Sequence, residues 1–305
     1  MTTEAVPGDG STPDPLWTDS ALVQASIAEN TRRAYEGALR QFENSGHPVT
    51  DSGVAAYLIR MYGQGRSATC AMMVVAALRF RARLHGWPSP VGVATTRVLA
   101  GFRRLAAERG RGQVTGVGWE QADRAAAMAE QPGDVAGLRD AAIVAVASDA
   151  LLRVSEIAAL DVPDVDLSEQ TVLIRRSKTD QEGMGVAQFL GQPTTARIRA
   201  WLRVSNLTDG ALFRAVNKSG RVQGERLTVR SVRRIITQRA KAAGVDGRVS
   251  GHSLRVGSAQ SLATAGASLV EMQVAGRWRS PAMPGRYVQG QLAKRGAVAR
   301  LRYGL

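Results

Sequence analysis

The chain is poor in cysteine, histidine and lysine, and it has no long apolar run. Cys70 is the only cysteine among 305 residues, which excludes an intramolecular disulfide and a cysteine-based metal cage. The longest purely apolar run, residues 70–78, is far shorter than the roughly 20 residues that a membrane span needs. The acidic, proline-containing start does not resemble a signal peptide. We therefore expect a cytoplasmic protein with no membrane segment.

Arginine dominates the charged residues and gives the chain a formal net charge of +14. The first 19 residues hold four acids and no base, residues 20–112 hold 13 arginines against five acids, and the remainder holds 27 basic residues against 17 acidic ones. Neutralising phosphates releases condensed counterions, so such a charge favours a polyanionic partner. Two basic halves predict double-stranded DNA gripped from two sides. The alternative is an arginine-rich composition with no binding role.

Length and composition predict two domains behind a short leader. Residues 1–20 carry three prolines among small and acidic residues, which is typical of a disordered tail. Residues 21–112 show helical periodicity and predict an all-helical DNA-binding domain. The glycine-rich stretch 113–118 predicts a flexible linker. Residues 119–305 then form a larger domain whose apolar and basic end, 297–305, is interpreted as a docking segment.

The first domain is expected to contain four helices. Asn30 opens the first, which closes at Gly46, and Asp51 caps the second. The third runs from Ser67 to His85, and the fourth spans residues 95–109.

The second domain is expected to be mainly helical with one β-hairpin. Helices over 119–131 and 138–160 precede a hairpin formed by residues 171–175 and 186–190. The helices that follow are expected over 230–243, from about Ser253, over 268–275, and around Tyr287 in a first helical turn. The fold class is therefore mainly α with a small β-hairpin.

Several residues outside any single motif carry groups suited to phosphoryl transfer. Arg153 and Glu156, three apart in a helical pattern, form a pair in which the carboxylate holds the guanidinium. Lys178, one of four lysines beside 36 arginines, lies near the hairpin tip and can release a proton, which arginine cannot. The alternative for each is an ordinary surface charge.

The segment from Gly251 onward combines four further groups. His252 and Arg255 stand three apart, a spacing that lets both address one phosphate. Trp278 offers an indole N–H, and Tyr287 offers a phenol that can act as a nucleophile. Taken singly, each also has a structural interpretation as a core, capping or surface residue. As DNA contacts we also expect Arg79, Arg81, Arg83, Arg230 and Arg248.

Together these residues resemble the tyrosine recombinases, the integrase family of DNA strand-exchange enzymes. The likeness rests on the order of the residues above and on Leu-Leu-Arg-Val-Ser-Glu-Ile, Gly-His-Ser-Leu-Arg-Val-Gly and Ala-Gly-Arg-Trp. It extends from about residue 20 to the end and is strongest over 151–290. The sequence looks most similar to the Cre-like phage and plasmid recombinases, in which tryptophan fills a position that is histidine in many integrases.

The resemblance implies a core-binding domain and a catalytic domain that form a C-shaped clamp on DNA. It also implies a division of roles. Arg153 and Arg255 hold the scissile phosphate, Tyr287 attacks it to leave a 3′-phosphotyrosine, and Lys178 protonates the 5′-hydroxyl. His252 accepts or donates a proton, Trp278 donates its indole N–H, and Glu156 supports the arginine and histidine geometry.

The resemblance further implies a nucleoid-associated protein that is monomeric in free solution and forms a homotetramer on two paired inverted-repeat sites. No metal, ATP or other cofactor is expected. Pro281, Pro284 and Gly285 depart from the family's usual helix before the nucleophile, which leaves cis or trans cleavage open. Two alternatives are a DNA-binding protein without catalysis and a nicking and closing enzyme similar to type IB topoisomerases. A metabolic enzyme is disfavoured because no phosphate-cradling glycine loop is present.

Overall fold

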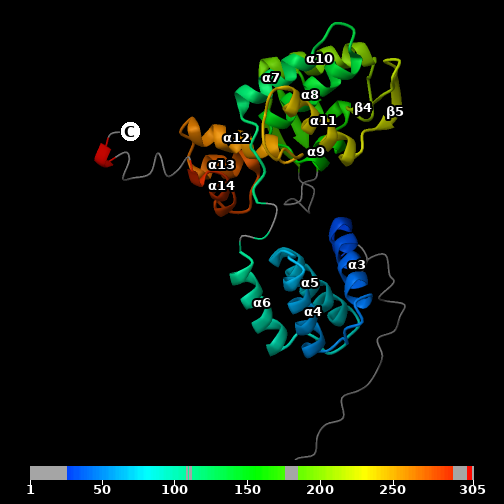
Figure 1. The fold of residues 1–305 in the computed structure, drawn as a ribbon. Helices are drawn as coiled ribbons and strands as arrows, with labels where there is room; N and C mark the ends of the chain where they lie inside the picture. Colours follow the sequence, from blue (N-terminus) through cyan, green and yellow to red (C-terminus); the bar gives the residue numbers. More distant parts are fainter. Residues whose placement is uncertain (1–25, 108, 110–111, 176–184, 291–300, 304–305) are drawn as a thin grey trace, which may run out of the picture. The chain divides into compact units, whose positions relative to one another are not determined.

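The computed structural model describes residues 26–107, 109, 112–175, 185–290 and 301–303. It divides into two compact units, Met1–Gly112 and Gln113–Leu305 (Figure 1). The interpretation of residues 1–20 as a disordered leader falls outside the described residues, as does most of the segment 297–305. Within the described part, no helix combines the length and the apolar character that crossing a bilayer requires.

The first unit is an all-helical bundle around one apolar core. Phe42, Leu58 and Leu78 come from different helices and are almost completely buried. Phe42 meets Tyr57 edge to face, with ring centroids 5.2 Å apart, a favourable aromatic arrangement. The helices are α3 (Glu29–Glu43), α4 (Asp51–Gly63), α5 (Ala68–Leu84) and α6 (Val93–Leu105).

Asp51 has a different role from the one that the sequence predicted. Thr50 caps α4 instead, because its side chain accepts a hydrogen bond from Gly53 N at 3.2 Å. The Asp51 carboxylate accepts from backbone N–H groups at the start of α6, those of Gly92, Ala94 and Thr95. Hydrogen bonding lowers the pKa of Asp51 because it favours the charged form; the Thr95 side chain contributes most, followed by the Thr95 backbone N–H. Asp51 therefore joins two helices of the bundle.

The second unit surrounds a nearly fully buried helix, α8 (Val135–Asp149). Small and branched apolar residues line all sides of α8, so α7, α10, α11 and α12 can pack around it. The other helices are α7 (Trp119–Ala129), α9 (Val154–Ala159), η1 (Val162–Asp164), α10 (Gln192–Ser205), α11 (Val229–Ala242), α12 (Ser253–Thr264), α13 (Leu269–Gly276) and α14 (Ala282–Tyr287). The sequence analysis did not identify α10.

Two small antiparallel sheets flank these helices. The expected hairpin is present as β2 (Thr171–Ile174) and β3 (Val186–Phe189), with Val172 opposite Gln188. A third strand, β1 (Val165–Asp166), extends this sheet in the order β1-β2-β3. A second sheet pairs β4 (Arg214–Val216) with β5 (Val222–Arg226). The prediction of a mainly helical fold with a small sheet is confirmed.

The single helix predicted over residues 138–160 is wrong. The helix breaks after Asp149, and α9 begins only at Val154. Leu151 adopts a left-handed conformation (φ 48°), which a continuous α-helix does not allow. The break turns the Leu151 carbonyl and Arg153 toward α12 and α13, and periodicity conceals it because apolar residues continue through the turn.

The segment interpreted as a flexible linker is partly fixed to the second unit. Thr115 N donates to Arg248 O at 3.0 Å, and Val117 N donates to Ser253 O at 2.9 Å. Val117 is fully buried, and its backbone lies so close to Gly257 that a Cβ there would stand 2.0 Å from Val117 O. Gly257 therefore allows the start of α12 to pack against this segment.

Helices α12, α13 and α14 lie together at one side of the second unit (Figure 1). Their apolar residues form a separate small core with Leu151, distinct from the core around α8. Trp278 and Val288 are buried in it, and Tyr287 packs against its edge. This cluster positions the groups described next.

Candidate active site

The Glu156 carboxylate holds Arg153 at the start of α9. Arg153 is the residue that precedes the helix and has an extended backbone, so it is not on a helical face as the sequence suggested. The Glu156 carboxylate accepts from Arg153 N at 2.9 Å and from the Arg153 guanidinium at 2.5 Å. Glu156 is 4% exposed. A buried carboxylate with two such bonds fixes the guanidinium in place.

His252 and Arg255 enter the site from the beginning of α12, as the sequence predicted. Arg255 is 1% exposed, and its guanidinium donates to the carbonyls of Leu151 and Gly276. Burial, followed by the positive charges of Arg153 and Arg277, lowers the pKa of Arg255 to about 9. Its buried Nε–H has no hydrogen-bond partner among the described residues. An unsatisfied buried donor of this kind can donate a hydrogen bond to an oxygen of an anionic ligand.

Trp278 covers one face of Arg255. The guanidinium carbon lies 4.5 Å from the centroid of the indole ring, within cation–π range. The indole is 7% exposed and packs against the tilted ring of Tyr287 at a centroid distance of 5.9 Å. Trp278 therefore joins the arginine to the phenol, and it also belongs to the small core.

Tyr287 ends α14 and lies beside His252. The sequence placed Tyr287 in a first helical turn, which is wrong: it is the last residue of Ala282–Tyr287, with Pro281 preceding the helix. The Tyr287 hydroxyl oxygen is 3.2 Å from His252 Nε2. Gln260 Nε2 donates to the Tyr287 carbonyl at 3.2 Å and so holds the end of α14 against α12. The phenol and the arginine cluster thus belong to one chain and one unit.

The environment of His252 favours its neutral form. Burial lowers the pKa of His252, and the positive charges of Arg255 and Arg153 lower it further. A neutral imidazole has one nitrogen lone pair that can accept a proton. Its position beside the Tyr287 hydroxyl is the geometry required of a general base for that oxygen.

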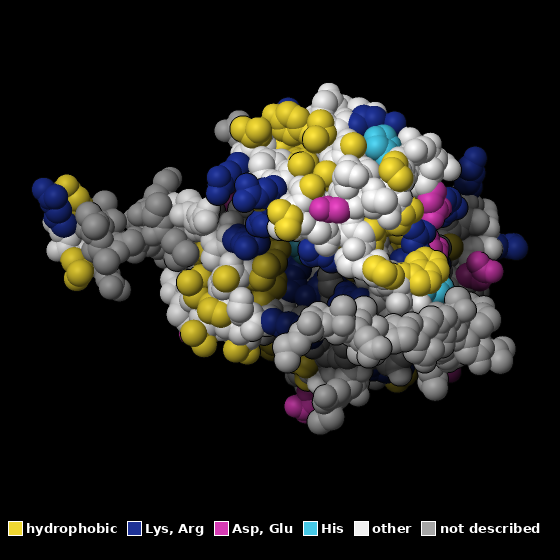
Figure 2. Space-filling view, turned by 90° about the horizontal axis from the view of Figure 1, so that it is seen from below, with side chains coloured by type: hydrophobic (Ala, Val, Ile, Leu, Met, Phe, Trp, Pro, Cys, Tyr) yellow, Lys and Arg dark blue, Asp and Glu magenta, His cyan; other side chains and the backbone are white. Residues whose placement is uncertain are grey.

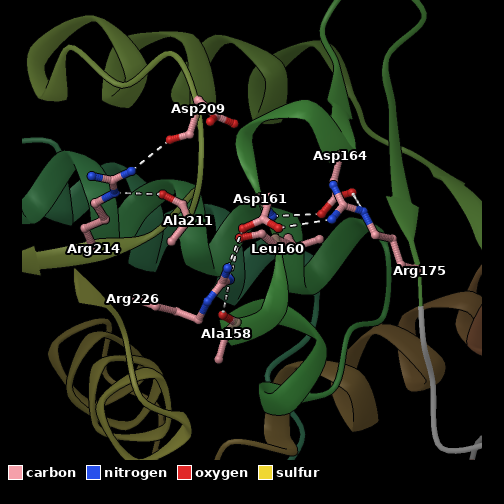
Figure 3. A network of polar contacts seen from close by, with 9 residues as sticks. All are labelled: Ala158, Leu160, Asp161, Asp164, Arg175, Asp209, Ala211, Arg214 and Arg226. Carbon is pink, nitrogen blue, oxygen red and sulfur yellow. Dashed lines mark hydrogen bonds and ion pairs between the residues drawn. The ribbon is translucent and has the colours of Figure 1, made fainter. Parts of the chain in front are cut away.

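Lys178 lies outside the described residues, but the strand that leads toward it is anchored. Arg175, directly after β2, pairs with Asp161 at 3.1 Å and with Asp164 at 2.6 Å (Figure 3). Arg226 of β5 also binds Asp161, and it donates to the Ala158 carbonyl at 2.9 Å. The Arg175 pairs connect the base of the hairpin to the segment that follows α9, the helix that Arg153 precedes.

The arginines expected to contact DNA differ in their exposure and in their ion pairs within the protein. Arg79 and Arg83 are exposed at the end of α5, whereas Arg81 forms an ion pair with Glu43 of α3. Arg248 is exposed after α11. Basic side chains gather in several groups on the face shown in Figure 2, where acidic side chains are few.

Helix α11 presents more arginine than the sequence analysis singled out. Arg230, Arg233 and Arg234 are all exposed, and they line one groove together with Ser231, Thr237 and Gln238. Val232, Ile235 and Ile236 are buried on the opposite side. Helical spacing from Arg230 was the signal that could have revealed the other two.

Sequence reasoning missed Arg277 altogether. Its guanidinium lies inside the site and donates to Glu156 Oε2 at 2.8 Å and to the Ala150 carbonyl at 2.9 Å. The Ala-Gly-Arg-Trp motif contains Arg277 and not the exposed Arg279 two positions on, but the motif by itself assigned Arg277 no role. Among the described residues, no group of three His, Cys, Asp or Glu side chains is placed to hold a metal ion.

The sequence matches the family model described as "Phage integrase family" over residues 119–293. It is 27% identical to the recombinase Cre of Escherichia phage P1 over 274 residues, which cover 83% of this chain and 80% of that protein. It is 30% identical to the tyrosine recombinase XerC of Mycobacterium bovis (strain BCG / Pasteur 1173P2) over 271 residues, covering 82% and 85% of the two chains.

Two solved structures share the fold. A lambda integrase dimer bound to a COC′ core site aligns with a TM-score of 0.61 at 17% identity, covering 90% of this chain and 93% of that one. The Tn1549 transposon integrase in complex with transposon right end DNA aligns with a TM-score of 0.60 at 16% identity, with the same coverage.

Proposed function

This chain belongs to the phage integrase family of tyrosine recombinases, and we propose that it is a site-specific DNA recombinase that cleaves and rejoins strands through a 3′-phosphotyrosine intermediate. The observation that carries the proposal is the position of the Tyr287 hydroxyl, 3.2 Å from His252 Nε2 and in the same unit as Arg153 and Arg255. A phenol, a base and two guanidiniums around one point suit the transfer of a phosphodiester to a side chain.

In the cleavage step, the Tyr287 oxygen forms a bond to phosphorus as its proton passes to His252. The bond from phosphorus to the 5′ oxygen breaks, and the leaving oxygen takes a proton from Lys178, a role assigned from its place in the family motif. Arg153 and the unsatisfied Nε–H of Arg255 bind the non-bridging oxygens. Their positive charge stabilises the negative charge that grows on those oxygens in the transition state.

Rejoining reverses these steps with the 5′-hydroxyl of another strand. The phosphotyrosine bond conserves the energy of the phosphodiester, so the reaction is independent of ATP. The guanidiniums and the Trp278 indole N–H supply the electrostatic stabilisation that a metal ion provides in other phosphoryl transfers, so the reaction is also metal-independent.

The binding mode follows from the basic surfaces and the family. Both units bind the duplex, with the exposed arginines of α11, Arg79, Arg83 and Arg248 contacting phosphates. The protein is a monomer in free solution, and four copies assemble on two paired inverted-repeat sites. Such a protein acts at the nucleoid, in the cytoplasm. The shared location of Tyr287 and the arginines favours cleavage in cis.

The test begins with the recognition site. The Tyr287→Phe protein, which keeps the DNA-binding surfaces, is used to select bound duplexes from a random-sequence pool. Two copies of the selected site are then placed on one plasmid, and the native protein is expected to recombine them in buffer containing a metal chelator and no ATP. Tyr287→Phe is expected to bind the site and to recombine nothing.

Each other outcome has a definite meaning. Relaxation of a supercoiled plasmid without exchange between the sites identifies a nicking and closing enzyme instead. Binding of the site with no strand cleavage by the native protein identifies a DNA-binding protein without catalysis. An adduct that persists in Tyr287→Phe shows that another residue is the nucleophile.

A further inference from the structure

Arg277 has a backbone conformation that arginine rarely adopts. It follows α13 with φ 52° and ψ 46°, in the left-handed region where glycine is usual after a helix. Few other non-glycine residues in the described part of the chain share this region: Leu151, Gln170 and Asn206. A side chain makes the left-handed region unfavourable for the backbone. The Arg277 side chain must therefore make contacts that compensate for this cost, or it must have a role in the active site.

The contacts of Arg277 converge on the support of Arg153. The Arg277 side chain is 6% exposed, and that of Glu156 is 3% exposed. Glu156 Oε2 accepts from Arg277 at 2.8 Å, and Glu156 Oε1 accepts from Arg153 at 2.5 Å. One buried carboxylate therefore lies between two guanidiniums, one of which faces the catalytic centre.

Arg277 also ties together two turns that carry the site. It donates to the Ala150 carbonyl at 2.9 Å, in the turn between α8 and α9, while its own backbone lies next to Trp278. The neighbouring Leu151 carbonyl accepts from Arg255. Arg277 thus shares the Glu156 carboxylate with Arg153 and precedes Trp278 in the chain. Arg255 binds the carbonyl next to the one that Arg277 binds.

We propose that Arg277 is a positioning residue for strand cleavage, acting through Glu156 and the α8–α9 turn to set the orientation and the net charge of the phosphate-binding arginines. The proposal rests on the recombinase function proposed above. The two Nη groups of Arg277 donate inside the protein, to the Ala150 carbonyl and to the Glu156 carboxylate, so the side chain is directed at the support of Arg153.

The physical reason is a matter of charge. With Arg277 present, the negative charge of Glu156 is shared between two cations, so the group of Arg153, Glu156, Arg255 and Arg277 retains two net positive charges. Without Arg277, the carboxylate would be compensated by Arg153 alone, and the positive field that stabilises the growing charge of the transition state would weaken. The carboxylate would also lose one of its two lateral restraints.

The experiment measures the single-turnover rate of covalent adduct formation on a nicked duplex that carries the selected site. Arg277→Gly suits the left-handed backbone and removes only the side chain. We expect its cleavage rate to fall by about 10- to 100-fold, the range typical for loss of a residue that orients a directly acting ligand. Its affinity for the duplex is expected to change little. Arg277→Lys, which keeps the charge but loses the fork, is expected to restore part of the rate.

The matched control is Arg279→Gly, which removes the same charge from an exposed position two residues on and is expected to leave the cleavage rate unchanged. A purely structural role is separated by a double-mutant cycle. If Arg277 acts through Glu156, then Arg277→Gly costs much less in a Glu156→Gln background than in the native protein. Independent costs in the two backgrounds would show that Arg277 does not act through Glu156 and would overturn the proposal.

The remaining outcomes also decide. If the native protein forms no adduct, the recombinase function itself fails. If the native protein forms the adduct and Arg277→Gly does so at the same rate, only the role of Arg277 fails. Should Arg277→Gly not fold at the assay temperature, Arg277→Lys is compared with Arg277→Met. Equal rates for these two would contradict the proposal, and a faster lysine variant would support it.

Discussion

The hydroxyl oxygen of Tyr287 lies 3.2 Å from Nε2 of His252, although 35 positions separate the two residues in the sequence. The contact depends on the small core of α12, α13 and α14, in which Trp278 packs against Tyr287 and over Arg255. The proposed nucleophile, its base and a phosphate-binding guanidinium therefore share one rigid support. Four predictions follow from this arrangement and from the surfaces around it.

Cleavage in cis is expected, because Tyr287 lies beside the His252 and Arg255 of its own chain. A mixture of Tyr287→Phe and Arg153→Ala proteins should then form no adduct on the selected site, since neither protomer holds a complete site. The measurement is denaturing electrophoresis of labelled DNA. Restoration of adduct by mixing would demonstrate that one protomer donates its tyrosine to a partner.

The dependence on pH should reflect the lowered pKa of His252. In the unfolded chain a histidine titrates near pH 6.5, so between about pH 6.5 and the lower pKa of the folded state the unfolded chain binds more protons. Above pH 6.5 the titration of His252 therefore costs no stability. As the pH falls below 6.5, the free energy of unfolding decreases. Cleavage by the folded protein should slow only as the pH falls through the lowered pKa of His252, below 6.5, because protonated His252 cannot accept the tyrosine proton.

The variant His252→Gln tests this assignment. Its unfolding free energy, measured by denaturant titration at several pH values, should fall less steeply below pH 6.5 than that of the native protein. His85→Gln in the first unit is the control for loss of a histidine as such. An identical slope in native protein and His252→Gln would contradict the assignment.

Gly276 should tolerate no side chain, because a Cβ there would stand 2.0 Å from the Trp278 ring. Gly276→Ala must displace the indole, which also covers Arg255. We expect a loss of about 1–3 kcal/mol in the unfolding free energy, the usual cost of overpacking, together with slower cleavage. Gly224→Ala is the control, since no atom lies within 4 Å of its Cβ position. Unchanged stability and cleavage in Gly276→Ala would show that the indole can move without consequence.

Binding to duplex DNA should weaken steeply with salt. If six to ten phosphates are neutralised, affinity falls by about a thousandfold to a hundred-thousandfold between 50 and 200 mM salt. Arg230→Gln should reduce the slope of log affinity against log salt by about 1. Arg81→Gln should have a smaller effect than Arg79→Gln or Arg83→Gln, because Arg81 already pairs with Glu43. Fluorescence anisotropy of a labelled duplex measures each slope, and a flat response would exclude phosphate-dominated binding.

The amino-acid sequence by itself determined the helical character, the β2–β3 hairpin and the residue types of the site. Periodicity is a local property, so it predicted the helices that end at strong signals such as Gly46 and the break before Trp119. The family resemblance rested on short motifs around Arg153, His252 and Trp278, and these can be read without coordinates. The family match over residues 119–293 agrees with that interpretation.

Only the tertiary structure decided how the site is held together. The break between α8 and α9, the left-handed backbone of Leu151 and Arg277, and the burial of Arg277 against Glu156 depend on contacts between segments more than 100 residues apart. In the sequence, Arg277 and Arg279 flank one tryptophan, and although only Arg277 lies in the Ala-Gly-Arg-Trp motif, the motif does not say which guanidinium is buried. They differ because one guanidinium is removed from water and must find partners inside the protein, while the other remains exposed, and that difference is fixed by packing alone.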